Sequence, residues 1–127
     1  MTDVSHERHA LAVVAEDVPL VRMEMADMLR DAGFEVDEVN DAAGALAYLE
    51  QRGGVTLLFT DIRMPGEMDG VGLAHEVARR WPGTRIIICS GAKRPAPAEI
   101  PAGALFFEKP FAPSQIRAAV NDLTPDA

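Results

Sequence analysis

Hydrophobic residues in this chain occur either in short continuous runs or at a spacing of three to four residues. Continuous runs are typical of strands covered on both faces, and the wider spacing is typical of helices with one buried face. Five segments have a strand-like pattern: residues 11–15, 34–39, 55–60, 85–89 and 104–108. The second of them alternates apolar and charged residues, as a half-buried edge strand does. Because helix-like segments lie between the strands, the pattern predicts an α/β fold with a doubly wound five-stranded parallel sheet.

Residues with known positional preferences mark the ends of the expected helices. Pro19 suits the first turn of one helix, and Asp41 suits the cap of a second helix that ends at Gly53. A third helix ends before Pro82. The last helix carries apolar residues along one face, at Ile116, Ala119, Val120 and Leu123.

The connection between the fourth and fifth strands departs from this pattern. Residues 91–103 include Pro95, Pro97 and Pro101. Each proline removes a helix hydrogen-bond donor and restricts the residue before it. We therefore expect the fourth helix to be short or missing, with at most one turn around Ala98.

Composition narrows the possible functions. The 127 residues fit one domain, expected at residues 10–123 between flexible tails at 1–9 and 124–127. A net charge of −8 argues against non-specific nucleic-acid binding. No apolar stretch is long enough to span a bilayer, and the polar start does not resemble a secretory signal. Cys89 is the only cysteine, so we expect a buried thiol in a reducing, cytoplasmic setting.

Polar and charged side chains that could take part in chemistry follow four of the five expected strands. Glu16 and Asp17 follow the first strand, Asp61 the third, Ser90 the fourth and Lys109 the fifth. The carboxyl ends of parallel strands lie at one edge of a sheet, where ligands bind in open α/β folds. Three carboxylates, a hydroxyl and an ammonium are therefore expected to converge. Such oxygen ligands suit Mg²⁺, which together with an ammonium can neutralise a phosphoryl group during its transfer to a carboxylate.

This constellation resembles the phosphoacceptor site of response regulator receiver domains. The resemblance covers residues 10–123 and includes a Met-Pro-Gly motif after Asp61, then Ser-Gly and Lys-Pro-Phe, in the family's order. It implies a flavodoxin-like fold in which Asp61 accepts a phosphoryl group. It also implies that Asp17 and Asp61 bind Mg²⁺ directly, while Glu16 often acts through water. The backbone carbonyl of Arg63 is expected as a further ligand.

The resemblance also implies roles around the phosphoryl group. Ser90 and Lys109 would contact its oxygens, and a cis peptide bond between Lys109 and Pro110 would direct the ammonium into the site. Phe106 matches the family's switch aromatic, which moves together with the loop that carries Ser90. Because this residue is Phe rather than Tyr, its switching must depend on packing alone. The connection at residues 91–103 is shorter than is usual in the family.

A receiver of this kind is expected to take its phosphoryl group from a histidine kinase or a histidine phosphotransfer protein. It would relay the group or signal to a downstream target protein, as a monomer or weak homodimer and not as an enzyme. Two alternatives stay open: a receiver-fold interaction module that takes no phosphate, and a receiver fragment of a hybrid histidine kinase. A haloacid-dehalogenase-type phosphatase is disfavoured, because Arg63 stands where such enzymes place an aspartate as general acid. We expect His6, His9 and His75 to be solvated surface residues.

Overall fold

All five strands of the protein pair in parallel within one sheet. The computed structural model describes residues 10–92 and 94–121, and the strand order is β2-β1-β3-β4-β5. The strands are β1 (Leu11–Ala15), β2 (Glu35–Val39), β3 (Leu57–Asp61), β4 (Arg85–Ser90) and β5 (Leu105–Glu108). The predicted doubly wound parallel sheet is confirmed, and β2 is the half-exposed edge strand that its alternating pattern indicates.

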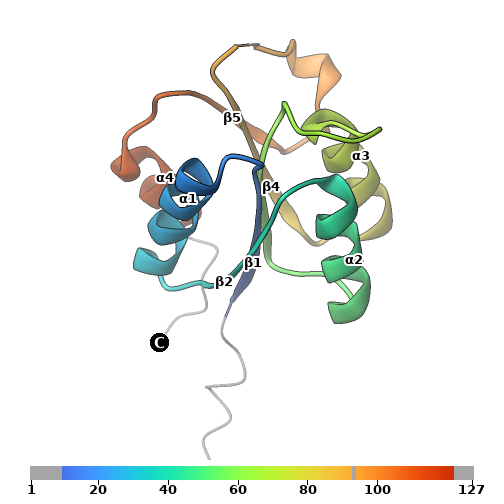
Figure 1. Cartoon of the computed structure of the whole chain (residues 1–127), viewed down its shortest axis with the longest axis horizontal. Coiled ribbons are helices and arrows are strands. Elements are labelled where there is room, and N and C mark those ends of the chain that lie inside the picture. Colours follow the sequence, from blue (N-terminus) through green and yellow to red (C-terminus); the bar gives the residue numbers. More distant parts are fainter. Residues whose placement is uncertain (1–9, 93, 122–127) are drawn as a thin grey trace, which may run out of the picture.

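Helices cover both faces of this sheet. Helices α1 and α4 pack on one face, and α2 and α3 pack on the other (Figure 1). Their bounds are α1 (Pro19–Asp31), α2 (Ala42–Arg52), α3 (Gly70–Arg80) and α4 (Pro113–Val120). Neighbouring residues of a strand point to opposite faces, so Phe59 of β3 belongs to the core under α1 and α4, whereas Leu58 belongs to the core under α2 and α3.

The helix ends follow the signals in the sequence. Pro19 is the first residue of α1. The carboxylate of Asp41 caps α2 by accepting a hydrogen bond from the N–H of Gly44 at 2.8 Å. Gly53 ends α2 with a φ of 72°, a conformation that glycine adopts without a steric penalty. These local preferences set where α1 begins and where α2 begins and ends, and hence the lengths of the loops that join these helices to the strands.

The connection from β4 to β5 has only one short 3₁₀ helix in its described part, η2 (Pro97–Glu99), as the prolines predict. The backbone carbonyl of Glu99 lies 2.8 Å from Nε2 of His75 on α3, and Pro101 is buried. His75 is exposed, as expected, but it also joins η2 to α3. The expectation of a short or missing fourth helix is confirmed.

Other expectations concern single residues and the ends of the chain. Cys89 is fully buried as expected, and this burial raises the pKa of its thiol to about 12. His6, His9, Leu123 and the two expected tails lie outside the described residues. Within residues 10–92 and 94–121, no helix combines the length and apolar character needed to cross a bilayer.

Candidate functional site

Three carboxylates meet at the carboxyl edge of the sheet. Glu16 and Asp17 directly follow β1, and Asp61 is the last residue of β3. Each offers an oxygen, and these oxygens lie within 4.8 Å of one another, the one such cluster found among the described residues. The three side chains line a hollow of about 470 Å³, shared with Arg63 and Lys109. The sequence-based expectation that these groups converge is therefore matched by their positions.

Lys109 provides a positive charge against the carboxylates. It follows β5, and its Nζ lies 3.1 Å from Oε1 of Glu16 and 3.2 Å from Oδ2 of Asp61. Its backbone N–H donates to the carbonyl of Ser90 at 3.0 Å, which ties the end of β5 to the end of β4. The peptide bond between Lys109 and Pro110 is cis. A single ammonium thus bridges carboxylates from two other strands.

Backbone donors orient the two inner carboxylates. Oε2 of Glu16 accepts a hydrogen bond from the N–H of Val18 at 3.0 Å, and Oδ1 of Asp61 accepts one from Ile62 at 2.8 Å. Glu16 is 1% exposed and Asp61 is 7% exposed, whereas Asp17 is exposed. Each inner carboxylate therefore has one oxygen held by the backbone and the other directed toward Lys109.

Burial and neighbouring charges shift the pKa values of Glu16 and Lys109. Burial raises the pKa of Glu16, and the neighbouring Asp61 raises it further, although the Val18 N–H and Lys109 act in the opposite direction. Burial alone would lower the pKa of Lys109, but its hydrogen bond to Glu16 and the negative charge of Asp61 outweigh that effect, and the pKa is raised. The ammonium therefore stays charged at neutral pH beside a crowded acidic group.

The chemistry of this donor set fits a hard divalent cation. Mg²⁺ prefers oxygen ligands and is usually bound through one or two carboxylates, with water and phosphate oxygens completing its shell. Glu16, Asp17 and Asp61 supply such oxygens in a hollow open to solvent. Three carboxylates against one ammonium leave an excess of negative charge that a divalent cation would neutralise.

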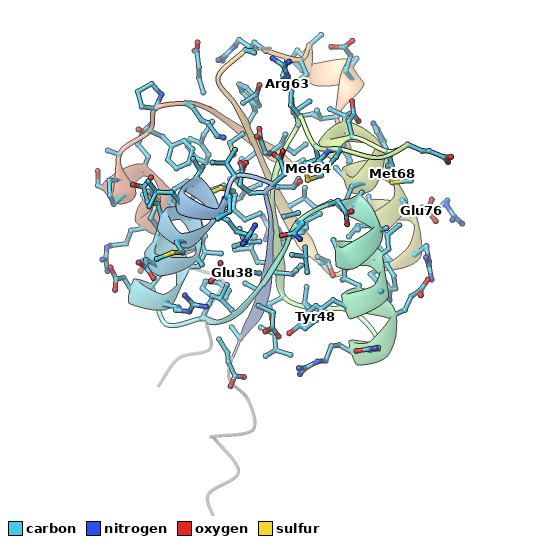
Figure 2. All side chains as sticks on the ribbon, in the orientation of Figure 1. Glu38, Tyr48, Arg63, Met64, Met68 and Glu76 are labelled. Atoms are coloured by element: carbon cyan, nitrogen blue, oxygen red, sulfur yellow. The ribbon has the colours of Figure 1, made fainter. Side chains whose placement is uncertain are left out.

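The remaining residues singled out in the sequence lie around this hollow. Asp61 pairs with Cys89 in the sheet register, so Ser90 lies one residue further along the same edge; its Oγ accepts a hydrogen bond from Ala92 N–H at 3.2 Å. Figure 2 shows Arg63 at the end of the molecule where the loops after β3 and β4 lie. Phe106 is half-buried on β5, with the guanidinium carbon of Arg94 5.3 Å from the centre of its ring.

Sequence reasoning missed Gly70, the first residue of α3. Its N–H donates to the carbonyl of Ile62 at 2.8 Å, so the start of α3 lies directly on the backbone of the β3 end. A Cβ at this position would overlap the carbonyl oxygen of Asp61 and lie 2.8 Å from Cα of Ile62. The only sign of this close approach in the sequence is that a glycine directly follows Asp69, the residue that caps the helix.

Sequence reasoning also missed Arg22 in the first turn of α1. One of its guanidinium nitrogens donates to the backbone carbonyl of Glu16 at 3.0 Å. In the sequence, an arginine on an amphipathic helix, five residues after an acidic pair, gives no distinctive signal. Its contact with the site depends on how α1 returns against the sheet.

Comparisons of this chain with known families, proteins and structures all point to the same family. A family model described as "Response regulator receiver domain" matches residues 12–121. The chain is 32% identical over 117 residues to the chemotaxis protein CheY of Thermotoga maritima. This match covers 88% of this chain and 95% of that protein. It is also 32% identical to the transcriptional regulatory protein PdtaR of Mycobacterium tuberculosis, over 86% of this chain but only 54% of that protein. The crystal structure of a response regulator receiver protein from Sinorhizobium medicae WSM419 matches with a TM-score of 0.82 at 27% identity, covering 92% of this chain and 95% of that one.

Proposed function

Because the chain belongs to the response regulator receiver domain family, we propose that Asp61 accepts a phosphoryl group from a phosphohistidine. The donor would be a histidine kinase or a histidine phosphotransfer protein, and the reaction would require Mg²⁺. One observation supports this proposal above the others: Asp61 ends a strand inside an acidic cluster, with the ammonium of Lys109 3.2 Å from its Oδ2. A carboxylate in this setting has both a cation site and a fixed positive charge beside it.

The proposed step is an in-line displacement at phosphorus. A carboxylate oxygen of Asp61 forms the new P–O bond while the P–N bond to the imidazole breaks, and its electron pair returns to the ring nitrogen. Lys109 neutralises a phosphoryl oxygen, and the hydroxyl of Ser90 donates a hydrogen bond to another. Bound at Glu16, Asp17, Asp61 and the Arg63 carbonyl, Mg²⁺ would supply the remaining charge neutralisation. The product is an acyl phosphate on Asp61, and we assign the protein to signalling and phosphorelay in the cytoplasm and not to substrate turnover.

A small phosphodonor provides a direct test. Incubation with acetyl phosphate and Mg²⁺ is expected to add one phosphoryl group, detected by intact-mass spectrometry and removed by hydroxylamine as an acyl phosphate is. Chelation of Mg²⁺ should prevent the addition, because the crowded carboxylates would then repel the incoming phosphate. An unchanged mass in the presence of Mg²⁺ would favour the alternative of an inert interaction module. Steady turnover of a phosphomonoester would instead indicate an enzyme.

The partner that delivers phosphate is proposed to dock on α1. Within the described residues, four large apolar side chains are exposed, and three of them lie between Asp17 and the second turn of α1: Val18 at 47%, Leu20 at 66% and Met23 at 51%. Other residues of α1, among them Val21 and Glu24, line a hollow of about 350 Å³ together with residues 109–111. Apolar side chains left in water at the edge of a reactive site are typical of a contact surface. A phosphohistidine-bearing helix packed here would have its imidazole close to Asp61.

Replacing Leu20 by Asp is expected to separate protein-mediated from small-molecule phosphorylation. A charge at the centre of an apolar contact should slow transfer from the cognate kinase about tenfold or more. The rate with acetyl phosphate should not change, because Leu20 does not line the hollow that holds the carboxylates. The cognate kinase would first be identified by phosphotransfer profiling, and radiolabelled transfer would then measure both rates.

Leu105→Asp is the matched control for this experiment. Leu105 is the fourth exposed large apolar residue, at 40%, and lies on the edge strand β5. Its substitution should leave kinase transfer unchanged. If the Leu105 variant loses transfer and the Leu20 variant keeps it, the docking surface is at β5 and the assignment to α1 is wrong.

A further inference from the structure

Arg22 connects the acidic pair to the neighbouring loop. Its guanidinium donates to the Glu16 carbonyl at 3.0 Å and to the side-chain oxygen of Asn40 at 2.8 Å, through the same nitrogen. Its Nε lies 3.3 Å from Oε1 of Glu38. The arginine side chain is 17% exposed, so these contacts form largely away from solvent. One planar group thus joins α1, the end of β1 and the loop after β2.

The carbonyl that Arg22 holds belongs to the peptide group between Glu16 and Asp17. The N–H of Glu16 donates to the carbonyl of Val39 at 3.1 Å, so the backbone of Glu16 is held on both sides. Fixing this peptide plane fixes the direction in which the chain presents the next side chain, Asp17. That carboxylate is exposed, and no described residue donates a hydrogen bond to it. The direction of the Asp17 carboxylate, toward Glu16 and Asp61, therefore depends on the conformation of the backbone.

We propose that Arg22 is a positioning residue for the cation site, which acts by orienting the peptide that carries Asp17. The inference rests on the proposed function in taking the cation to be Mg²⁺. Arginine suits this role because its planar guanidinium can donate hydrogen bonds to several acceptors at once, whereas the ammonium of lysine is a single compact charge. Groups that hold metal ligands in place commonly change metal affinity about 10- to 100-fold when they are removed.

A simple charge effect predicts the opposite result. Arg22 is positive and close to the site, so removing it would strengthen cation binding if only its charge mattered. Loss of positioning instead weakens cation binding. The sign of the change in Mg²⁺ affinity therefore distinguishes the two explanations.

Arg30 offers a matched control on the same helix. It also pairs with Glu38, at 3.2 Å, and donates to the carbonyl of Val36 at 3.3 Å (Figure 2 labels Glu38). Its alanine variant therefore loses an arginine that ties α1 to β2. Arg30 makes no hydrogen bond to Glu16 or Asn40. A role limited to joining α1 and β2 would affect both arginines alike.

The experiment is titration calorimetry with Mg²⁺ on the full chain, well below the lowest Tm of the set. Arg22→Ala is expected to raise the Kd about tenfold or more, Arg22→Lys to raise it several-fold, and Arg30→Ala to leave it unchanged. In the metal-free protein, the amide resonance of Asp17 should shift in both Arg22 variants and stay in place in Arg30→Ala. If Arg22→Ala does not fold, the lysine variant alone decides the matter.

Two results would overturn the proposal in different ways. An Arg22→Lys or Arg22→Ala variant with the wild-type Kd, or a tighter one, shows that Arg22 does not position the ligands while the cation site itself stands. A wild-type protein with no saturable Mg²⁺ binding overturns the role of Arg22 together with the metal-dependent function proposed above.

Discussion

Replacing Asp61 by Asn is expected to abolish phosphorylation entirely, with acetyl phosphate and with the cognate kinase alike. An amide oxygen is a far weaker nucleophile than a carboxylate, and the amide nitrogen offers hydrogens where either Ile62 N–H or Lys109 now donates. The variant should stay folded, because one oxygen remains as an acceptor and the crowded acidic cluster loses one negative charge. Intact-mass spectrometry of the treated protein measures the effect, and circular dichroism verifies the fold.

Asp69→Asn is the control for this substitution. Asp69 ends the loop that follows Asp61, and its carboxylate caps α3 by accepting a hydrogen bond from Gly72 N–H at 2.9 Å. Asn caps helices about as well as Asp, so this variant should fold and accept phosphate like the wild type. A phosphoryl adduct on the Asp61→Asn protein would mean that another residue is the acceptor, and peptide mapping would identify it.

Gly70→Ala is expected to be the most damaging single substitution for the fold around the site. The new methyl group would overlap the carbonyl oxygen of Asp61, and backbone atoms there have no rotamer through which to move away. Overpacking usually costs about 1–3 kcal/mol, and we expect the upper end of that range. For a domain of this size that is a fall in Tm of about 10 °C. Because the displaced carbonyl belongs to Asp61, Mg²⁺ binding should weaken as well.

Gly72→Ala separates this steric effect from a general effect of alanine. Gly72 lies two residues further along α3, and its added Cβ would meet the side chain of Met68, with Cγ at 2.9 Å. Methionine is flexible and can rotate away, while alanine favours the helix by up to about 1 kcal/mol. The Tm of this variant should be close to that of the wild type. Equal losses in the two variants, measured by differential scanning calorimetry, would contradict the proposed overlap at Gly70.

The main features of the site could be predicted because they follow from the order of residues along the chain and from the parallel direction of the strands. Asp61 follows an apolar run that is too short for a helix and is closed by a Pro/Gly loop, and Glu16-Asp17 follows a similar run. Parallel strands bring such ends to one edge, and the carboxylate oxygens are indeed within 4.8 Å of one another. The roles of Ser90 and Phe106 stay predictions, because each depends on how a side chain responds to a bound phosphoryl group.

Two contributors to the site were not predictable in this way. Gly70 matters because α3 begins directly on the backbone of Asp61, a distance that depends on the path of the intervening loop. Arg22 matters because its guanidinium reaches Glu16 and Asn40 together, which requires β2 to lie beside β1. Neither contact is encoded in a local pattern of residue types.

The sequence by itself determined the parallel α/β architecture, the helix ends at Pro19, Asp41 and Gly53, and the edge at which the polar residues gather. Those features follow from local hydrophobic periodicity and from backbone preferences of single residues, which act over a few positions. Only the tertiary structure decided that Lys109, 93 residues from Glu16, bridges Glu16 and Asp61. Such contacts depend on strand order, loop path and packing distance, because atoms far apart along the chain interact only once the whole sheet has brought them together.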